Sequence, residues 1–196
     1  MIGLDRYNAV SNLMETGDLL LWRGDTPLGK AIRLFSHAQV NHASLVMRFQ
    51  QYEGAERRRF TSEALEHGIV LHLLSKSLAD YNGQCWWYPL KIDVGTPLRK
   101  TPLRGQANDD RSVPTTLLGR EEVGERALKY MGTPYDYEAL FKNAIEKVKA
   151  DPQRLFCSEY CFLCYGMEGL APTPGEMPAL GIFDDPILIW DSRESK

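Results

Sequence analysis

The sequence predicts an α+β domain, and three observations lead to that class. Segments of strand character follow one another between residues 17 and 90, whereas segments with helical spacing of apolar residues dominate between residues 121 and 166. The 196 residues, of which 43% are hydrophobic and 25% charged, suffice for one domain with its own core. We therefore expect a single domain over residues 1–196, in which an antiparallel sheet packs against helices.

Helices and strands alternate before residue 50. Residues 4–15 have the spacing of a short amphipathic helix, and residues 17–22 indicate a turn followed by a buried strand. Residues 26–36 predict a second helix, because Pro27 suits the first helical position. Residues 42–49 alternate small or apolar with polar residues, as a core strand does.

Three further strands are predicted at residues 60–65, 68–74 and 84–90, with turn signals between them. Their spacing is typical of successive antiparallel strands. Residues 99–118 contain prolines, a glycine and a run of polar residues, a composition that cannot bury a core. We expect a long mobile loop there rather than a linker between domains.

The second half of the chain predicts three helices and a closing strand. Residues 121–131 and 137–149 each carry apolar side chains on one face, with a Gly-Thr-Pro break between them. The third helix holds three of the four cysteines. The proline-rich tail is expected to wrap irregularly before a short strand at residues 187–190.

Charge and hydropathy exclude several classes of function. The net charge is −3 and the isoelectric point about 5.8, so the chain lacks the basic footprint of a nucleic-acid-binding protein. The cluster Arg57-Arg58-Arg59 is short and follows acidic residues, which favours a solvated turn. No apolar run approaches the roughly 20 residues that span a bilayer, and early charges interrupt any secretory leader. We expect a cytoplasmic protein with reduced cysteines; its oligomeric state stays open.

Residues 155–166, Leu-Phe-Cys-Ser-Glu-Tyr-Cys-Phe-Leu-Cys-Tyr-Gly, carry the strongest chemical signal. We expect their helix to begin at or just before Cys157, because Asp151-Pro152 should block helix continuation upstream. A thiol in the first turn of a helix meets unpaired N–H groups and the positive end of the dipole, which favour the thiolate. Cys157 is therefore a candidate nucleophile. Cys161 and Cys164 follow on the same face and are expected to be small core residues.

A cysteine nucleophile needs an imidazole as base and a polar group that orients the imidazole. His42, at the start of a predicted strand, is the first candidate for the base, and Glu63, on the adjacent strand, for the orienting group. The residues alone leave alternatives open, namely His37, His67 and His72 for the base and Glu66 and His72 for the third position.

Two other functions fit parts of the same sequence. Cys157, Cys161 and Cys164 spell C-x3-C-x2-C, the spacing by which radical S-adenosylmethionine enzymes hold an iron–sulfur cluster. Thiolates on successive turns of one helix do not converge well on a cluster. The chain could also be a binding module that holds a lipid or peptide in a groove between helix and sheet. Four aromatic residues could line that groove: Trp22, Trp86, Trp87 and Tyr88.

Four motifs resemble, in order, those of one known family. They are the Gly-Asp strand at residues 17–22, the strand that starts with histidine at 41–46, the Glu-Ala and Gly-Val segments at 62–70, and a Tyr segment at 132–137 followed by Phe-Cys-Ser-Glu at 156–159. The chain is similar to a circularly permuted member of the NlpC papain-like superfamily, the YiiX-like group related to the lecithin retinol acyltransferase family. The resemblance implies a papain-like sheet or half-barrel, packed against helices, with the nucleophile at a helix N-terminus.

This resemblance also implies an activity, that of a cysteine peptidase, amidase or acyltransferase without metal or cofactor. Cys157 would be the nucleophile, His42 the general base and Glu63 the group that orients the imidazole, while the N–H of Cys157 would donate to the oxyanion. The acyl donor would be an amide, thioester or ester, with bacterial cell-wall peptides and lipid or fatty-acyl groups as candidate substrates. Three residues are expected to contact the substrate: Tyr135, Trp22 and Ser158.

Overall fold

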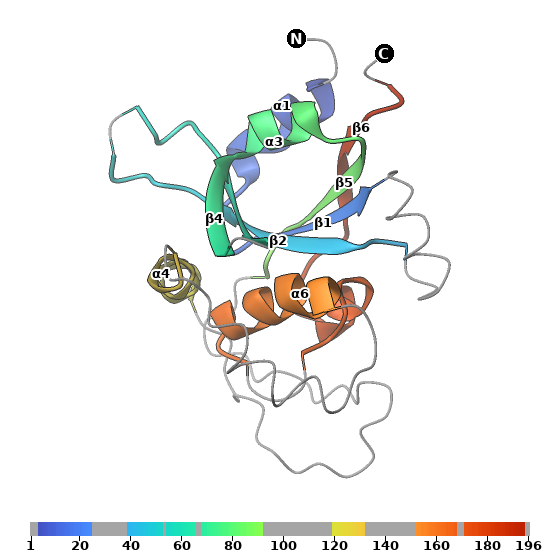
Figure 1. The fold of residues 1–196 in the computed structure, drawn as a ribbon. Helices are drawn as coiled ribbons and strands as arrows, with labels where there is room; N and C mark the ends of the chain where they lie inside the picture. Colours follow the sequence, from blue (N-terminus) through green and yellow to red (C-terminus); the bar gives the residue numbers. More distant parts are fainter. Residues whose placement is uncertain are drawn as a thin grey trace.

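The computed structural model describes residues 4–24, 39–52, 54–65, 68–91, 119–131, 152–167 and 171–194. These residues form one six-stranded sheet in the order β4-β3-β2-β1-β5-β6, in which every neighbouring pair of strands is antiparallel. Helices lie on both sides of the sheet (Figure 1). The predicted α+β class is therefore confirmed.

The strand β1 (Leu19–Gly24) lies in the middle of the sheet, between β2 (His42–Met47) and β5 (Gly83–Tyr88). On one side β3 (Phe60–Leu65) and β4 (Gly68–Leu73) continue the sheet beyond β2. On the other side β6 (Ile187–Asp191) pairs with β5. All six strands coincide with predicted ones to within a few residues, because their alternation or continuous apolar character is strong.

The sheet buries side chains on both of its faces. In β1, Leu19 and Leu21 belong to the core cluster that includes α6 (Pro152–Cys164), whereas Leu20 and Trp22 belong to a second cluster. That second cluster includes residues of α1 (Asp5–Val10) and α3 (Leu74–Asp80), which Figure 1 shows on the side of the sheet away from α6. Successive strand residues point to opposite faces, so one strand supplies both cores.

Three predicted helices are present, one of which is the cysteine-bearing α6, and among the described residues one α-helix was not predicted. The helix expected at residues 4–15 is α1 followed by the 3₁₀-helix η1 (Ser11–Leu13), and the helix expected at 121–131 is α4 (Arg120–Lys129). The unpredicted helix is α3, which turns the chain after β4 and buries Leu74 and Leu78 four residues apart. No helix in the described ranges combines the length and the apolar character that a membrane span requires.

The tail differs from its predicted irregular form, because it contains the 3₁₀-helix η2 (Pro174–Leu180). Thr173 precedes that helix and forms a capping box with Glu176, and Pro174 occupies the first helical position. The helices predicted at residues 26–36 and 137–149 and the loop predicted at 99–118 lie outside the described residues.

A buried carboxylate joins three elements at one end of the sheet. Asp18, 0% exposed, accepts hydrogen bonds from the Trp87 indole N–H at 2.8 Å and from the Leu90 N–H at 2.9 Å. The Arg120 guanidinium in the first turn of α4 donates to the same carboxylate at 2.6 Å. Because each of its oxygens is satisfied, Asp18 is stably buried and fixes α4 against β1 and β5.

Candidate functional site

The helix that carries the cysteines lies against the two strands that carry the predicted base and orienting group. α6 packs on β2 and β3, and Figure 1 shows α6 next to β2. Cys157 is 0% exposed within the core cluster on that face. His42 is the first residue of β2, and Glu63 lies inside β3. The structure thus brings these three residues into one region.

The position of Cys157 within its helix differs from the prediction. α6 begins at Pro152, so Cys157 lies in the second turn rather than the first. The prediction treated Asp151-Pro152 as a barrier to the helix. Proline is in fact well suited to the first helical position, where its missing N–H has no intrahelical partner to lose. Pro152 therefore starts the helix instead of delaying it.

This earlier start removes two expected features of Cys157. In a regular helix, the N–H of a residue in the second turn is directed at a carbonyl of the preceding turn. The N–H of Cys157 is therefore not available to an oxyanion, although the sequence analysis predicted that it would be. The helix dipole also acts mainly within the terminal turn. Any activation of Cys157 must therefore come from neighbouring side chains.

His42 is the neighbour that links Cys157 to Glu63. Its Nε2 lies 2.9 Å from Oε2 of Glu63, and both side chains are largely enclosed, with 21% and 10% of their surface exposed. The imidazole also hydrogen-bonds the side chain of Cys157. Since the carboxylate occupies Nε2, Nδ1 is the nitrogen left for the sulfur. One ring thus lies between a thiol and a carboxylate.

The charges of these neighbours reinforce one another. Burial alone lowers the pKa of His42, but the charge and hydrogen bond of Cys157, followed by those of Glu63, outweigh burial and raise that pKa to about 10. Burial alone raises the pKa of Glu63, yet the hydrogen bond and charge of His42, and then those of His72, hold it below its ordinary value. At neutral pH the site therefore holds an imidazolium beside a carboxylate.

A second imidazole contacts the other oxygen of the same carboxylate. Nδ1 of His72 lies 3.3 Å from Oε1 of Glu63, and the His72 side chain is 51% exposed. The sequence had treated His72 as an alternative to His42 or to Glu63, whereas the structure shows the three together. The sheet register explains this: Thr61 pairs with His72, and Glu63 lies two residues further along the same face of β3.

The remaining two cysteines of α6 have different surroundings. Cys161 and Cys164 are 0% exposed in the core cluster, as predicted for small core residues. Burial raises the pKa of Cys161 well above its ordinary value and that of Cys164 to about 12. Among the described residues, no group of three or more His, Cys, Asp or Glu side chains is arranged to hold a metal ion.

A buried hydrogen bond that the sequence did not indicate holds α6 on the sheet. The hydroxyls of Ser62 in β3 and Tyr160 in α6 lie 2.6 Å apart. Both residues are completely buried. Serine and tyrosine are common in any fold, so nothing in the sequence marked this pair. Because Ser62 adjoins Glu63, the bond fixes the helix next to the strand that carries the carboxylate.

The residues predicted to contact substrate have separate locations. Trp22 pairs with His42 in the sheet register, but its side chain is 2% exposed and its indole N–H donates to Ser44 at 2.8 Å, so it belongs to the core. Ser158 is buried beside Cys157 in α6. Four predicted or alternative residues lie outside the described ranges: Tyr135, His37, His67 and Glu66.

Comparisons with known proteins give a structural likeness but no sequence family. No protein-family model matches the chain, and no curated protein matches it. Among solved structures, the chain is similar to the "metalloprotein yiiX from Escherichia coli O157:H7, DUF1105", with a TM-score of 0.45 and 18% sequence identity. The match covers 78% of this chain and 64% of the other, so the chain spans less than two thirds of that neighbour's length. This weak neighbour carries the name of the group that the sequence resembles; membership stays a prediction.

Proposed function

We propose that this chain is a cysteine hydrolase or acyltransferase with a permuted papain-like fold, in which Cys157 is the nucleophile, His42 the acid and base, and Glu63 the group that orients His42. One observation supports it above all: the His42 ring hydrogen-bonds the Cys157 side chain and the Glu63 carboxylate at once. A nucleophile, a base within hydrogen-bond reach and a third group that orients the base are the features of covalent acyl transfer.

The proposed reaction has two stages. The Cys157 thiolate attacks the carbonyl carbon of an amide, thioester or ester, and a C–S bond forms. The bond to the leaving group then breaks as protonated His42 donates a proton to that group. In the second stage, neutral His42 takes a proton from water or another acceptor, whose oxygen or nitrogen attacks the acyl-enzyme. The C–S bond breaks, and the thiolate and the imidazolium are restored.

Glu63 serves this reaction by its position and its charge. Its carboxylate fixes the plane of the His42 ring through the 2.9 Å contact, and its negative charge stabilises the imidazolium that the first stage needs. The pKa of Glu63 lies below its ordinary value, so the carboxylate is charged at neutral pH. His72 holds the second carboxylate oxygen and so acts as a positioning residue.

The burial of Cys157 favours a second candidate, a module of the same fold that binds a lipid or peptide without chemistry. Cys157 is 0% exposed, so a substrate carbonyl reaches its sulfur only after a local opening. Of the aromatic residues expected to line a groove, Trp87 is buried on the other face, while Trp86 and Tyr88 are partly exposed beside the α6 cluster. A binding module would use these two residues and would leave Cys157 unmodified.

An acyl-trapping experiment separates the two candidates. The protein is incubated with a panel of activated acyl esters, acyl thioesters and cell-wall peptides, and the acylated peptide is identified by mass spectrometry. The enzyme should carry the acyl group on Cys157, and Cys157→Ala should abolish both the adduct and turnover. Cys161→Ala is the matched control, because this cysteine is one turn away on α6 and equally buried. Turnover that survives in Cys157→Ala would contradict the proposal.

A further inference from the structure

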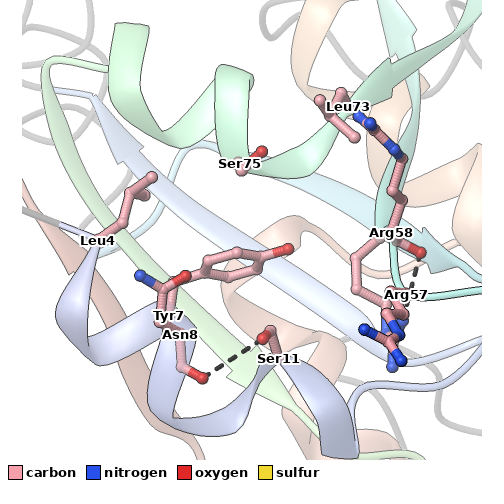
Figure 2. Close-up of a pocket in the computed structure, with 9 residues that line it drawn as sticks. Leu4, Tyr7, Asn8, Ser11, Arg57, Arg58, Leu73 and Ser75 are labelled. Atoms are coloured by element: carbon pink, nitrogen blue, oxygen red, sulfur yellow. Dashed lines mark hydrogen bonds between the residues drawn. The ribbon is translucent and has the colours of Figure 1, made fainter. Parts of the chain in front are cut away.

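A pocket of about 280 Å³ opens on the side of the sheet away from α6. It is bounded by α1 and η1, by the connection from β2 to β3, and by the junction of β4 with α3 (Figure 2). The lining residues are Leu4, Tyr7, Asn8, Ser11, Arg57, Arg58, Arg59, Leu73 and Ser75. Leu4 and Tyr7 belong to the second core cluster, so the sheet separates this pocket from Cys157.

The charge of the pocket is positive. Three consecutive arginines line it, and no Asp or Glu is among the lining residues. Arg57 and Arg58 are exposed, as predicted for a solvated turn, and their guanidinium groups form no hydrogen bond or ion pair with any residue that the structure describes. These two groups are therefore available to a ligand.

Arg59 departs from the predicted solvated turn, because it is 1% exposed. Its guanidinium donates only to backbone carbonyls, those of Met14 at 2.7 Å, Asn12 at 3.2 Å, and Glu56 and Arg58 at 3.3 Å each. These contacts fix its orientation without neutralising its charge. A buried charge is normally paired, and no carboxylate in the described part of the chain forms an ion pair with Arg59.

The carboxylates that act on the charge of Arg59, those of Glu15 and Asp18, are each ion-paired with another arginine. Glu15 is paired with Arg48 and accepts a hydrogen bond from Gln50 at 3.2 Å. Glu56 offers its backbone carbonyl to Arg59, while its carboxylate does not line the pocket. The pocket wall therefore keeps an excess of positive charge that an anion would balance.

Neutral hydroxyl groups line the same pocket as the arginines. Figure 2 shows the ring of Tyr7 lying across the pocket between Ser11 and Ser75, with its hydroxyl directed to the side where the arginines lie. A phosphate group offers acceptor oxygens in several directions, which suits an arginine fork combined with hydroxyl donors. We propose that this pocket binds a phosphate group, as a free phosphate or as the headgroup of a lipid, at a site distinct from Cys157.

Phosphate titration of the full chain tests this proposal. Inorganic phosphate is titrated at constant ionic strength, and binding is followed by calorimetry and by amide chemical shifts. Arg57→Ala/Arg58→Ala should weaken binding about tenfold or more, since the variant removes the two exposed guanidinium groups of the pocket and their charge-assisted hydrogen bonds to the anion. The control, Lys91→Ala/Lys129→Ala, also removes two exposed positive charges but leaves the pocket intact, and it should change the affinity less than about twofold. Equal losses in the two double variants would overturn the proposal.

A milder variant and a second ligand complete the test. Tyr7→Phe removes one hydroxyl and keeps the packed ring, so it should weaken phosphate binding about threefold to tenfold while the protein stays folded. Vesicles of phosphatidic acid in phosphatidylcholine, compared with phosphatidylcholine alone, distinguish a lipid headgroup from a free phosphate. The site is supported if the wild-type chain binds either phosphate source and the Arg57→Ala/Arg58→Ala variant loses that binding. Absence of saturable binding to both sources by the wild-type chain would refute it.

Discussion

The two halves of α6 carry the same residue type in different surroundings. Cys157 and Cys161 lie one turn apart, and both are 0% exposed in the same core cluster. Cys157 hydrogen-bonds the ring of His42, which leads on to Glu63 and His72. Around Cys161, burial dominates and raises the pKa of the thiol well above its ordinary value. Exposure and helix position therefore do not distinguish the two cysteines, whereas their neighbours do.

This difference indicates which groups would make Cys157 reactive. A cysteine at a helix N-terminus can be activated by the helix itself, but α6 begins too early for that. The charges that remain belong to side chains of the sheet, carried on β2, β3 and β4. The activation of Cys157 would then depend on the register of these strands, and a single substitution in the sheet would abolish it.

The largest effect is expected from His42→Gln. The glutamine amide can still donate to Glu63, but it carries neither the positive charge nor the basic nitrogen that faces Cys157. We expect the rate of Cys157 alkylation by iodoacetamide at pH 6, relative to that of Cys161 in the same molecule, to fall about 100-fold. Quantitative mass spectrometry of the two peptides measures this ratio.

Cys161 is an internal control in this measurement, because any general opening of the structure exposes both thiols. If the two cysteines of the wild-type chain reacted equally at pH 6, or if His42→Gln left their ratio unchanged, the neighbours of Cys157 would not distinguish it from Cys161.

A second prediction concerns the free energy of unfolding as a function of pH. The pKa of His42 is raised from 6.5 to about 10, so its protonated form stabilises the fold fully below about pH 6.5, and this contribution is lost as the pH rises towards 10. The pKa of Glu63 is lowered, so its contribution is present above its ordinary value of 4.5 and is lost in more acidic solution. Between pH 6.5 and 10, the stability advantage of the wild-type chain over His42→Gln should decline by about 1–3 kcal/mol.

Urea unfolding at pH 6, 8 and 9.5 measures that advantage. Gln84→Ala serves as a control, because this residue lies in β5 and its side chain bonds Asp191 rather than the site. The loss in free energy of unfolding caused by Gln84→Ala should vary little between pH 6 and 9.5. A wild-type advantage that grew with pH would contradict the assigned ion pairing.

Most of the sheet could be predicted from the sequence, because strand alternation and turn residues are local signals. The order histidine, glutamate, cysteine also pointed to the three side chains that the structure brings together. The predicted start of α6 was wrong for a local reason, because a proline can either end a helix or occupy its first position. The choice depends on packing against β2 and β3, which the sequence does not reveal.

Contacts that depend on pairing between distant segments were harder to predict. The sequence offered His72 and Glu66 as competitors of Glu63, because it gave no register between β3 and β4. The register places Glu63 and His72 on one face, where they cooperate. Trp22 was expected at the substrate, yet it packs into the core, because the alternation in β1 directs it away from α6. Arg59 likewise became a buried cation through carbonyls of residues far from it in the sequence.

The smallest effect is expected from His72, whose side chain is 51% exposed and whose contact with Glu63, at 3.3 Å, is longer than that of His42. An exposed pair of this kind contributes about 1 kcal/mol or less, so His72→Ala should slow the pH 6 alkylation of Cys157 by about threefold. His72→Asn should restore most of the rate, because the asparagine amide N–H can take the place of Nδ1. The alkylation of Cys161 and the free energy of unfolding should stay nearly constant in both variants. A rate loss that also appeared at Cys161, or that asparagine did not rescue, would show that His72 supports the fold and does not position Glu63.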